Sequence, residues 1–222
     1  MGAGKKTISF TLDILRKEIM IKTIIFDLGG VLIDWNPDYL YKTIFDREAE
    51  MKWFYDNICT PDWNEEQDAG RDLAEGTELL VKQFPEHEHN IRAFYSRWEE
   101  MLKGPIHDTV DIFKELKASG NYQLLALTNW SHQTFPIALQ RFDFLHWFDG
   151  KVVSGEEKTR KPFMDIYEMV INRYQVDPAS AVYIDDNARN LVPAKELGMA
   201  AIHFKNPAQL RADLKSLGVN LL

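Results

Sequence analysis

The chain has 222 residues, of which 45% are hydrophobic and 27% charged, an ordinary composition for a globular protein. Its formal net charge of −8 argues against a general nucleic-acid binder, because no basic stripe is available to pair with phosphates. A small anionic substrate is still allowed, since it needs only a local positive site. Cys59 is the single cysteine, so an intrachain disulfide is excluded and we expect a reducing, cytoplasmic environment. No apolar run approaches the length of a membrane span.

Residues 1–19 precede the first predicted strand. Four charged residues between Asp13 and Glu18 interrupt what would have to be the apolar region of a signal peptide. We interpret 1–19 as an accessory N-terminal extension. Whether it belongs to the native protein, or whether Met20 is the natural start, stays open.

The first predicted strand is a short apolar run from Thr23 to Phe26 that ends at a carboxylate, Asp27. A continuous apolar run of this kind is typical of a strand buried on both faces of a parallel sheet. In open α/β sheets, ligands bind just beyond the carboxyl ends of the strands. Asp27 is therefore a candidate functional residue, with an ordinary strand-end turn as the alternative.

The segment 35–105 is aromatic-rich and contains no convincing strand. Its apolar residues recur at helical spacing, and helices are predicted from Pro37 and at 47–58, 61–71, 73–84 and 91–102. We interpret 35–105 as a helical cap inserted into a core domain that consists of 20–34 and 106–222.

Beyond residue 106, helices and strands alternate. Strands are predicted at 122–127, 150–153, 181–184 and 200–204, and helices at 108–118, 131–141, 163–174, 188–197 and from Pro207. Pro136 must kink its helix or mark a late start, and Phe163 is placed on a buried stripe. Strands separated by such helices imply right-handed βαβ crossovers. The predicted fold class is α/β, a Rossmann-like parallel sheet with an inserted α-helical cap.

Polar residues follow four of the predicted strands: Asp27, Thr128-Asn129, Lys161 and Asp185-Asp186. In a parallel sheet these positions converge on one edge. A carboxylate nucleophile, a hydroxyl, an ammonium and an acidic pair together suit phosphoryl transfer. A hard divalent cation would offset the repulsion between the carboxylates and the phosphate.

Each of these groups also has a plainer interpretation. Thr128-Asn129 is compatible with a strand-end turn or a helix cap. Lys161 lies in a basic run, 158–161, that is compatible with a solvated loop. The adjacent acids Asp185 and Asp186 are harder to explain in this way, because they repel each other unless a cation sits nearby. The occurrence of all four sets, in order and at strand ends, favours the functional interpretation.

At these residues the chain resembles the haloacid dehalogenase (HAD) superfamily of phosphohydrolases, in its Asp-Leu-Gly subgroup of sugar-phosphate phosphatases and dehalogenase-like sequences. The resemblance extends over nearly all of the chain from Met20 onward. Its four motifs are Phe26-Asp27-Leu28-Gly29-Gly30-Val31, Leu127-Thr128-Asn129, Lys161-Pro162 with Ile166-Tyr167, and Tyr183-Ile184-Asp185-Asp186-Asn187.

The resemblance implies a role for each motif residue. Asp27 would be the nucleophile, and Thr128 and Lys161 would bind phosphate. Mg²⁺ would be held by Asp27, the carbonyl of Gly29 and Asp186. Asp185 and Asn190 would support the ion. Further candidate substrate-binding residues are Leu28, Gly29, Asn129 and Arg71.

One position departs from the superfamily pattern. Phosphatases of the superfamily usually carry a second aspartate, the general acid and base, two residues after the nucleophile, and here that position is Gly29. Losing a positioned acid–base group typically costs about 10² to 10⁴ in rate. Its substitute could be water, the leaving group of the substrate itself, or a cap residue.

Three functions are compatible with the sequence. The favoured one is a Mg²⁺-dependent phosphatase acting on a small phosphorylated metabolite, with a sugar phosphate as the preferred class. A 2-haloacid dehalogenase would use Asp27 without a metal, but such enzymes lack the acidic pair Asp185-Asp186. The third is a catalytically weak phosphate-binding regulatory protein. Trp63, Gln67, Asp68 and Arg71 have the composition of a cap loop that reaches into the site, with an exposed helix–turn–helix junction as the alternative. The oligomeric state stays open.

Overall fold

The computed structural model describes residues 20–221, and the N-terminal extension 1–19 lies outside the described residues. A five-stranded parallel sheet forms the centre of the molecule, in the order β5-β4-β1-β6-β7. The strands are β1 (Thr23–Phe26), β4 (Gln123–Thr128), β5 (Gly150–Val153), β6 (Ala181–Asp185) and β7 (Ala200–His203). Each predicted strand is present within a residue of its predicted ends, and the α/β class is confirmed.

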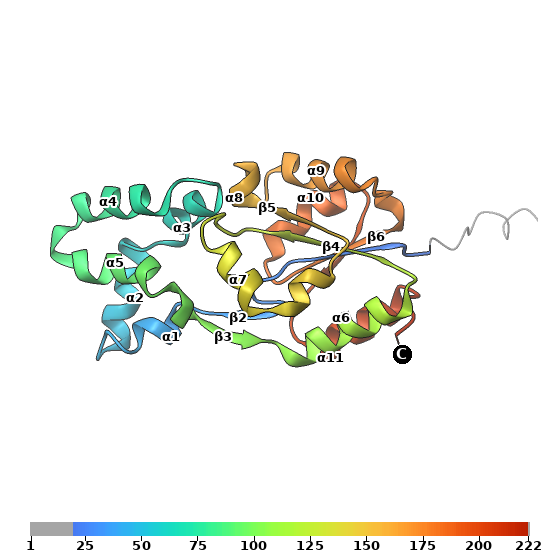
Figure 1. The fold of residues 1–222 in the computed structure, drawn as a ribbon, viewed down its shortest axis with the longest axis horizontal. Helices are drawn as coiled ribbons and strands as arrows, with labels where there is room; N and C mark the ends of the chain where they lie inside the picture. Colours follow the sequence, from blue (N-terminus) through green and yellow to red (C-terminus); the bar gives the residue numbers. More distant parts are fainter. Residues whose placement is uncertain (1–19, 222) are drawn as a thin grey trace, which may run out of the picture.

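Helices cover both faces of the sheet, which explains why its strands are apolar without alternation. Ile24 and Phe26 of β1 belong to one buried cluster, and Ile25 between them belongs to the other. The first cluster is completed by α6 (His107–Ser119), α7 (Phe135–Arg141) and α11 (Pro207–Ser216). The second is completed by α9 (Met164–Tyr174) and α10 (Leu191–Glu196). In Figure 1, α9 and α10 lie above the sheet and α6 and α11 below it.

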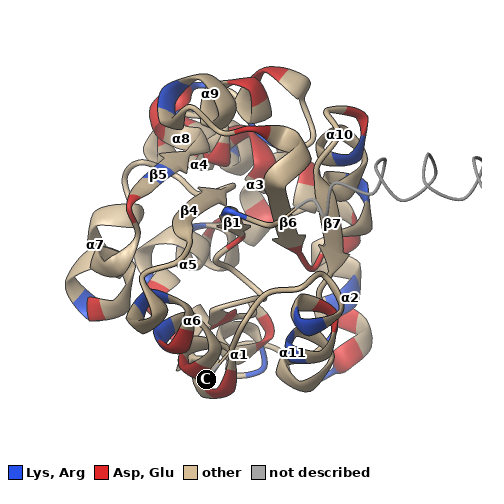
Figure 2. Ribbon diagram, turned by 90° about the vertical axis from the view of Figure 1, so that its right-hand side faces the viewer, with Lys and Arg blue, Asp and Glu red and all other residues tan. Residues whose placement is uncertain are grey.

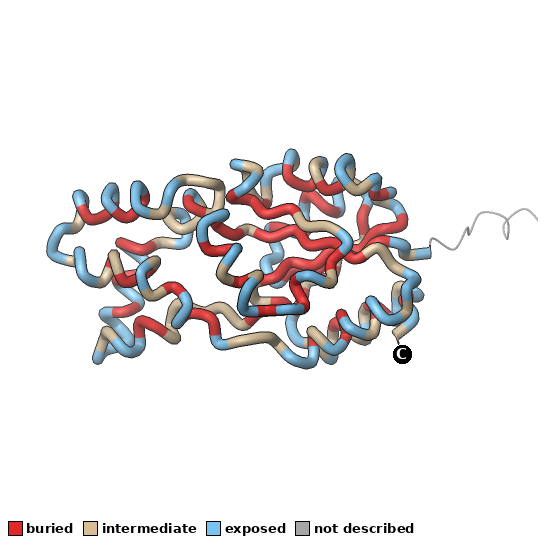
Figure 3. The backbone as a smooth tube through the Cα atoms, in the orientation of Figure 1, coloured by how far each residue is buried: buried red, intermediate tan, exposed pale blue. Residues whose placement is uncertain are grey.

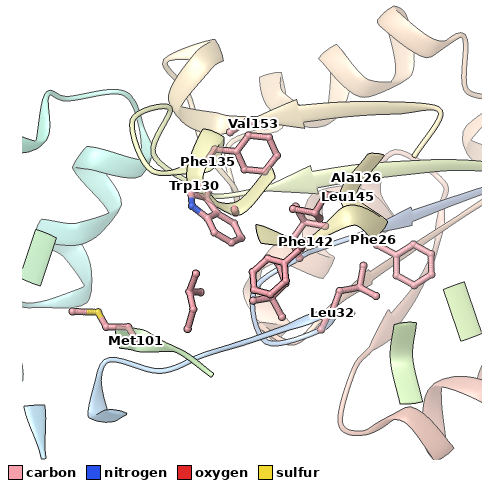
Figure 4. Close-up of a cluster of buried hydrophobic side chains, with 14 of the residues drawn as sticks. Phe26, Leu32, Met101, Ala126, Trp130, Phe135, Phe142, Leu145 and Val153 are labelled. Carbon is pink, nitrogen blue, oxygen red and sulfur yellow. The ribbon is translucent and has the colours of Figure 1, made fainter. Parts of the chain in front are cut away.

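The core is continuous from the sheet toward the helices at the other end of the molecule. The strands are buried along most of their length (Figure 3). Figure 4 shows Phe26 and Ala126 of neighbouring strands in one cluster with Phe142 and Leu145, which follow α7. Trp130 and Met101 of the same cluster extend it toward the first helices of the chain. Both signs of charge are interspersed on the helices around the sheet (Figure 2).

Five helices form the end of the molecule that is drawn at the left of Figure 1. They are α1 (Asp38–Tyr41), α2 (Glu48–Asn57), α3 (Pro61–Asp68), α4 (Leu73–Gln83) and α5 (Glu88–Ser96). Two short antiparallel strands join them to the sheet, β2 (Ile33–Trp35) and β3 (Leu102–Pro105). We refer to residues 35–105 as the cap. Its boundaries stay a prediction.

The expectation that 35–105 contains no strand was wrong at β3. This strand has only four residues, its pairing with β2 is interrupted by a register shift, and Gly104 and Pro105 end it. So short a segment carries no period-2 pattern, and only the pairing partner makes it a strand. The predicted helix 91–102 also divides, since α5 ends at Ser96 and a 3₁₀ turn covers Trp98–Met101.

Several helix ends follow directly from local chemistry. Gly120 ends α6 with a φ of +64°, and the Asn206 side chain accepts a hydrogen bond from the Gln209 N–H at the start of α11. Pro136 lies in the first turn of α7, so the late start is correct. Phe163, by contrast, is 54% exposed because it precedes α9 instead of lying on its buried stripe.

The remaining short elements connect these units. They are α8 (Ser154–Glu157) and 3₁₀ turns at Pro85–His87, Asp143–Trp147, Pro178–Ser180 and Ala188–Asn190. Among residues 20–221, none of the helices combines the length and the apolar character needed to cross a membrane.

Candidate active site

Asp27 lies at the carboxyl end of β1, the central strand of the sheet. Its Oδ1 accepts a hydrogen bond from the backbone N–H of Leu28 at 2.7 Å, and its Oδ2 lies 2.9 Å from the Lys161 ammonium. Burial raises the pKa of this carboxyl, Asp185 and Asp186 raise it further, and only Lys161 opposes them. The anionic form of Asp27 therefore depends on nearby positive charge.

Lys161 is almost completely buried, with its Nζ between two carboxylates. It lies 2.9 Å from Asp27 Oδ2 and 2.7 Å from Asp185 Oδ2. Asn129 fixes the backbone of this residue, because its Oδ1 accepts the Lys161 N–H at 2.8 Å and its Nδ2 donates to the Lys161 carbonyl at 3.0 Å. The solvated-loop interpretation is thus wrong for Lys161, and Asn129 acts on it through the backbone.

Asp185 ends β6 and has no exposed surface. Besides Lys161, it accepts hydrogen bonds from the Tyr183 hydroxyl, from the Asn187 N–H at 2.8 Å and from Asn190 Nδ2 at 3.1 Å. Burial alone would raise its pKa, but Lys161 and these donors hold the pKa below its usual value. Asp185 is therefore a fixed anion that orients the lysine. The hydrogen bond from Tyr183 to Asp185 was not predicted from the sequence, although Tyr183 lies within the fourth motif.

Three carboxylates at these strand ends form a compact donor set. One oxygen from each of Asp27, Asp185 and Asp186 lies within 4.8 Å of the others. Asp186 is exposed, and its pKa is raised by desolvation and by the neighbouring Asp185. Hard oxygen donors so closely spaced suit Mg²⁺, which prefers carboxylates and water. Gly29, whose carbonyl is a further candidate ligand, lines the same cavity.

Thr128, at the end of β4, is buried, and its Oγ1 has no hydrogen-bond partner among the described residues. Leaving a buried hydroxyl unpaired costs about 1–3 kcal/mol, so a ligand oxygen at this place would be stabilising. Leu28 is also fully buried, so its side chain belongs to the core. Only its backbone N–H lies at the site, where it bonds to Asp27.

A cavity of about 530 Å³ opens above these strand ends, between the sheet and the cap. From the sheet side it is lined by Asp27, Gly29, Asn129, Lys161 and Asp186, and from the cap side by Trp35, Tyr55, Asn64, Asp68 and Phe94, among others. A pocket of this volume accommodates a small metabolite. Most sequence-predicted site residues therefore face one space.

Arg71 does not line this cavity. Its Nε donates to Gln67 Oε1 at 2.6 Å, which turns the guanidinium toward the interior of the cap. Trp63 also points inward, with its Nε1 donating to the Gly76 carbonyl at 3.1 Å. Of the cap cluster predicted from the sequence, only Asp68 reaches the cavity.

Charged pairs hold the cap against the core beside the cavity. Glu65 of α3 pairs with Arg160 at 3.2 Å and with Arg189. Arg160 directly precedes Lys161, and Arg189 follows the acidic pair by three positions. These ion pairs were not predicted from the sequence, because no spacing pattern relates position 65 to positions 160 and 189. The structure therefore has the cap closed over the site.

Gly30 allows a close approach of Asp186 to the first loop. Its φ is +73°, and an added Cβ would lie 2.8 Å from Asp186 Cγ and closer still to Oδ2. Gly30→Ala is therefore expected to displace Asp186 and to weaken Mg²⁺ binding roughly 10- to 100-fold. Titration calorimetry with MgCl₂ measures this. Gly120→Ala is the matched control, because its φ of +64° is similar and no described atom lies within 4 Å of a Cβ there. Equal Mg²⁺ affinity in the two variants would contradict the prediction.

A parallel sheet with helices on both faces, an aspartate after its central strand, and a buried lysine and acidic pair beside it define a hydrolase with a Rossmann-like core. The chain belongs to the haloacid dehalogenase-like hydrolase family, which it matches over residues 21–198.

Several proteins similar to this chain are phosphatases by name. A sesquiterpene phosphatase from Aspergillus oryzae is 26% identical over 196 residues, which is 88% of this chain and 96% of the relative. A phosphorylated-carbohydrate phosphatase from Thermotoga maritima is 28% identical over 82% of this chain and 84% of its own. Among solved structures, a HAD family enzyme from Bacteroides thetaiotaomicron in complex with magnesium and inorganic phosphate superposes with a TM-score of 0.61. It is 24% identical, and the match covers 84% of this chain and 95% of that one.

Proposed function

We propose that this protein is a Mg²⁺-dependent phosphatase that hydrolyses a small phosphorylated metabolite, with a sugar phosphate as the favoured class, through an aspartyl-phosphate on Asp27. The observation that carries the proposal is the joint placement of Asp27, Lys161 and the acidic pair at one sheet edge, with three carboxylate oxygens within 4.8 Å. The phosphatase names of the relatives and the magnesium and phosphate in the structural neighbour support it.

Each residue has a part in the first half of the reaction. The Asp27 oxygen attacks phosphorus while the bond to the leaving group breaks. Lys161 neutralises a phosphoryl oxygen, and the unpartnered Thr128 hydroxyl donates to another. Asp27, Asp186 and the Gly29 carbonyl would hold Mg²⁺, with Asp185 behind them. When bound, the ion would screen the negative charges of the nucleophile and the phosphoryl group from each other.

The lining of the cavity supports a polyhydroxylated leaving group. The lining residues combine the aromatic side chains of Trp35, Tyr55 and Phe94 with amide and carboxylate groups such as those of Asn64 and Glu65. An apolar surface with a few placed polar groups fixes the orientation of a small ligand. The same aromatic side chains would also pack against an apolar chain, so prenyl phosphates are included among the substrates to be tested.

Chelation of divalent cations is expected to lower phosphate release roughly 10³-fold, because a Lewis acid supplies several kcal/mol of transition-state stabilisation. The measurement is phosphate release from a panel of sugar, polyol and prenyl phosphates, in excess EDTA and after addition of MgCl₂. Halide release from 2-haloacids is measured in parallel. Metal-independent dehalogenation without phosphatase activity would overturn the proposal in favour of a dehalogenase. Tight phosphate binding without turnover would overturn it in favour of a regulatory protein.

A further inference from the structure

Two cavities meet beside Gly29, the position at which the superfamily pattern has its acid. The main cavity continues into a smaller one of about 80 Å³, which extends between the cap and the loop after β4. Five described residues line both: Gly29, Trp35, Asn64, Asp68 and Asn129. Of these five, only Asp68 can exchange a proton near neutral pH. The cap therefore supplies a carboxyl to the space that Gly29 leaves open.

Hydrogen bonds from both the cap and the core hold Asp68 in place. Asn64 Nδ2 donates to its Oδ2 at 3.0 Å, and the Tyr95 hydroxyl donates to Asn64 Oδ1 at 2.9 Å. From the core, the Ser154 hydroxyl donates to the backbone carbonyl of Asp68. The cap amide of Asn64 thus fixes one carboxyl oxygen of Asp68, and Ser154, which follows β5, fixes its backbone.

The surroundings of Asp68 allow both of its protonation states near neutral pH. Burial raises the pKa of this carboxyl to about 7, against the opposing effects of the Ser131 N–H and the positive charges of Lys161 and Arg160. The Tyr95 hydroxyl also faces it from α5. A group that gives up a proton in one step and takes one in the next works best when its pKa lies near the working pH.

We propose that Asp68 is the general acid and base of the reaction, delivered by the cap in place of the aspartate missing at position 29. This inference rests on the proposed phosphatase function. In the first step, Asp27 forms a bond to phosphorus, the bond from phosphorus to the leaving oxygen breaks, and Asp68 gives its proton to that oxygen. In the second step, Asp68 takes a proton from water as the water oxygen bonds to phosphorus. The bond from phosphorus to Asp27 breaks, which releases inorganic phosphate and restores both residues.

Asp68→Asn tests this role, because the amide keeps the shape of the side chain but carries no transferable proton. Asp62→Asn is the matched control, since Asp62 is an exposed aspartate in the first turn of the same helix. Two substrates are compared in MgCl₂: the best alkyl phosphate of the panel and p-nitrophenyl phosphate, whose leaving group needs no proton. Steady-state rates, p-nitrophenolate bursts and acid-trapped phosphoenzyme are measured for both variants and the wild type.

Asp68→Asn is expected to lower kcat/KM for the alkyl phosphate about 10²- to 10⁴-fold. With p-nitrophenyl phosphate, it should give a stoichiometric burst and accumulate phosphoenzyme, because the second step lacks its base. For the wild type and Asp62→Asn, kcat/KM for the alkyl phosphate should fall as the pH rises through about 7, where Asp68 loses its proton. This descending limb should be absent in Asp68→Asn.

Equal losses for both substrates without phosphoenzyme accumulation would overturn the proposal, since they indicate a role in cap structure. Wild-type rates in Asp68→Asn would also overturn it. Failure of the underlying function looks different, because the wild-type protein itself would then release no phosphate from any substrate.

Discussion

Asp27→Asn is expected to abolish phosphatase activity, with a fall in kcat of roughly 10⁴- to 10⁶-fold, as is typical when an enzyme loses its nucleophile. The amide has the shape of the carboxyl but cannot form the acyl phosphate. Phosphate release in MgCl₂ measures the fall, and mass spectrometry of the protein after rapid mixing with substrate should show an 80 Da adduct, roughly the mass of a phosphoryl group, only in the wild type.

This loss should leave the fold intact, which separates chemistry from stability. Burial and the neighbouring acids disfavour the anionic form of Asp27, so a neutral amide is not expected to cost stability. Lys161 keeps its ion pair with Asp185 at 2.7 Å. As the control, the melting temperature of Asp27→Asn is measured in EDTA and should be close to that of the wild type in EDTA. Residual turnover within tenfold of the wild type would show that another group attacks phosphorus.

Lys161→Met is expected to affect both stability and activity. It removes the buried ammonium that pairs with Asp27 and Asp185, and breaking a buried ion pair by removing one partner costs about 3–5 kcal/mol. Activity should fall by at least about 10²-fold, because a preorganised group that neutralises transition-state charge is lost. Urea unfolding in EDTA measures the free energy of unfolding, and phosphate release in MgCl₂ measures the rate.

The matched control is Lys195→Met, which changes the same residue type on the exposed side of α10. It should alter the free energy of unfolding by less than about 0.5 kcal/mol and leave the rate unchanged. If Lys161→Met unfolds at the same urea concentration as this control, the buried pairs do not stabilise the fold as the geometry indicates.

The sheet and the motif residues could be predicted because their signals are local. A strand buried on both faces is a short apolar run, and each run here ends at a polar group, as at Asp27 and Asp185. Parallel topology then brings those ends to one edge without further information. Gly120 and Asn206 fixed helix ends for the same reason, since a cap is a property of a few neighbouring residues.

What could not be predicted depends on contacts between distant segments. Arg71 was predicted to bind substrate and Asp68 was not, but the side chain of Gln67 holds Arg71 inside the cap, and Asp68 lines the cavity instead. The two hydrogen bonds between Asn129 and the backbone of Lys161 join residues 32 positions apart, a relation that no spacing rule expresses. Strand β3 exists only through its pairing with β2.

The central position of β1 also determines at what stage of folding the site can form. Thr23 pairs with Gln123 on one side and with Ala181 on the other, so the strand that carries Asp27 finds its neighbours only after most of the chain has been synthesised. Pairings between segments so far apart in sequence form slowly, because the chain must lose loop-closure entropy before the stabilising contacts form. Until β6 docks, Asp27 has neither Asp185 nor Asp186 beside it. A nascent chain without β6 therefore lacks two of the three carboxylates of the proposed metal site, so the proposed activity would require the completed sheet.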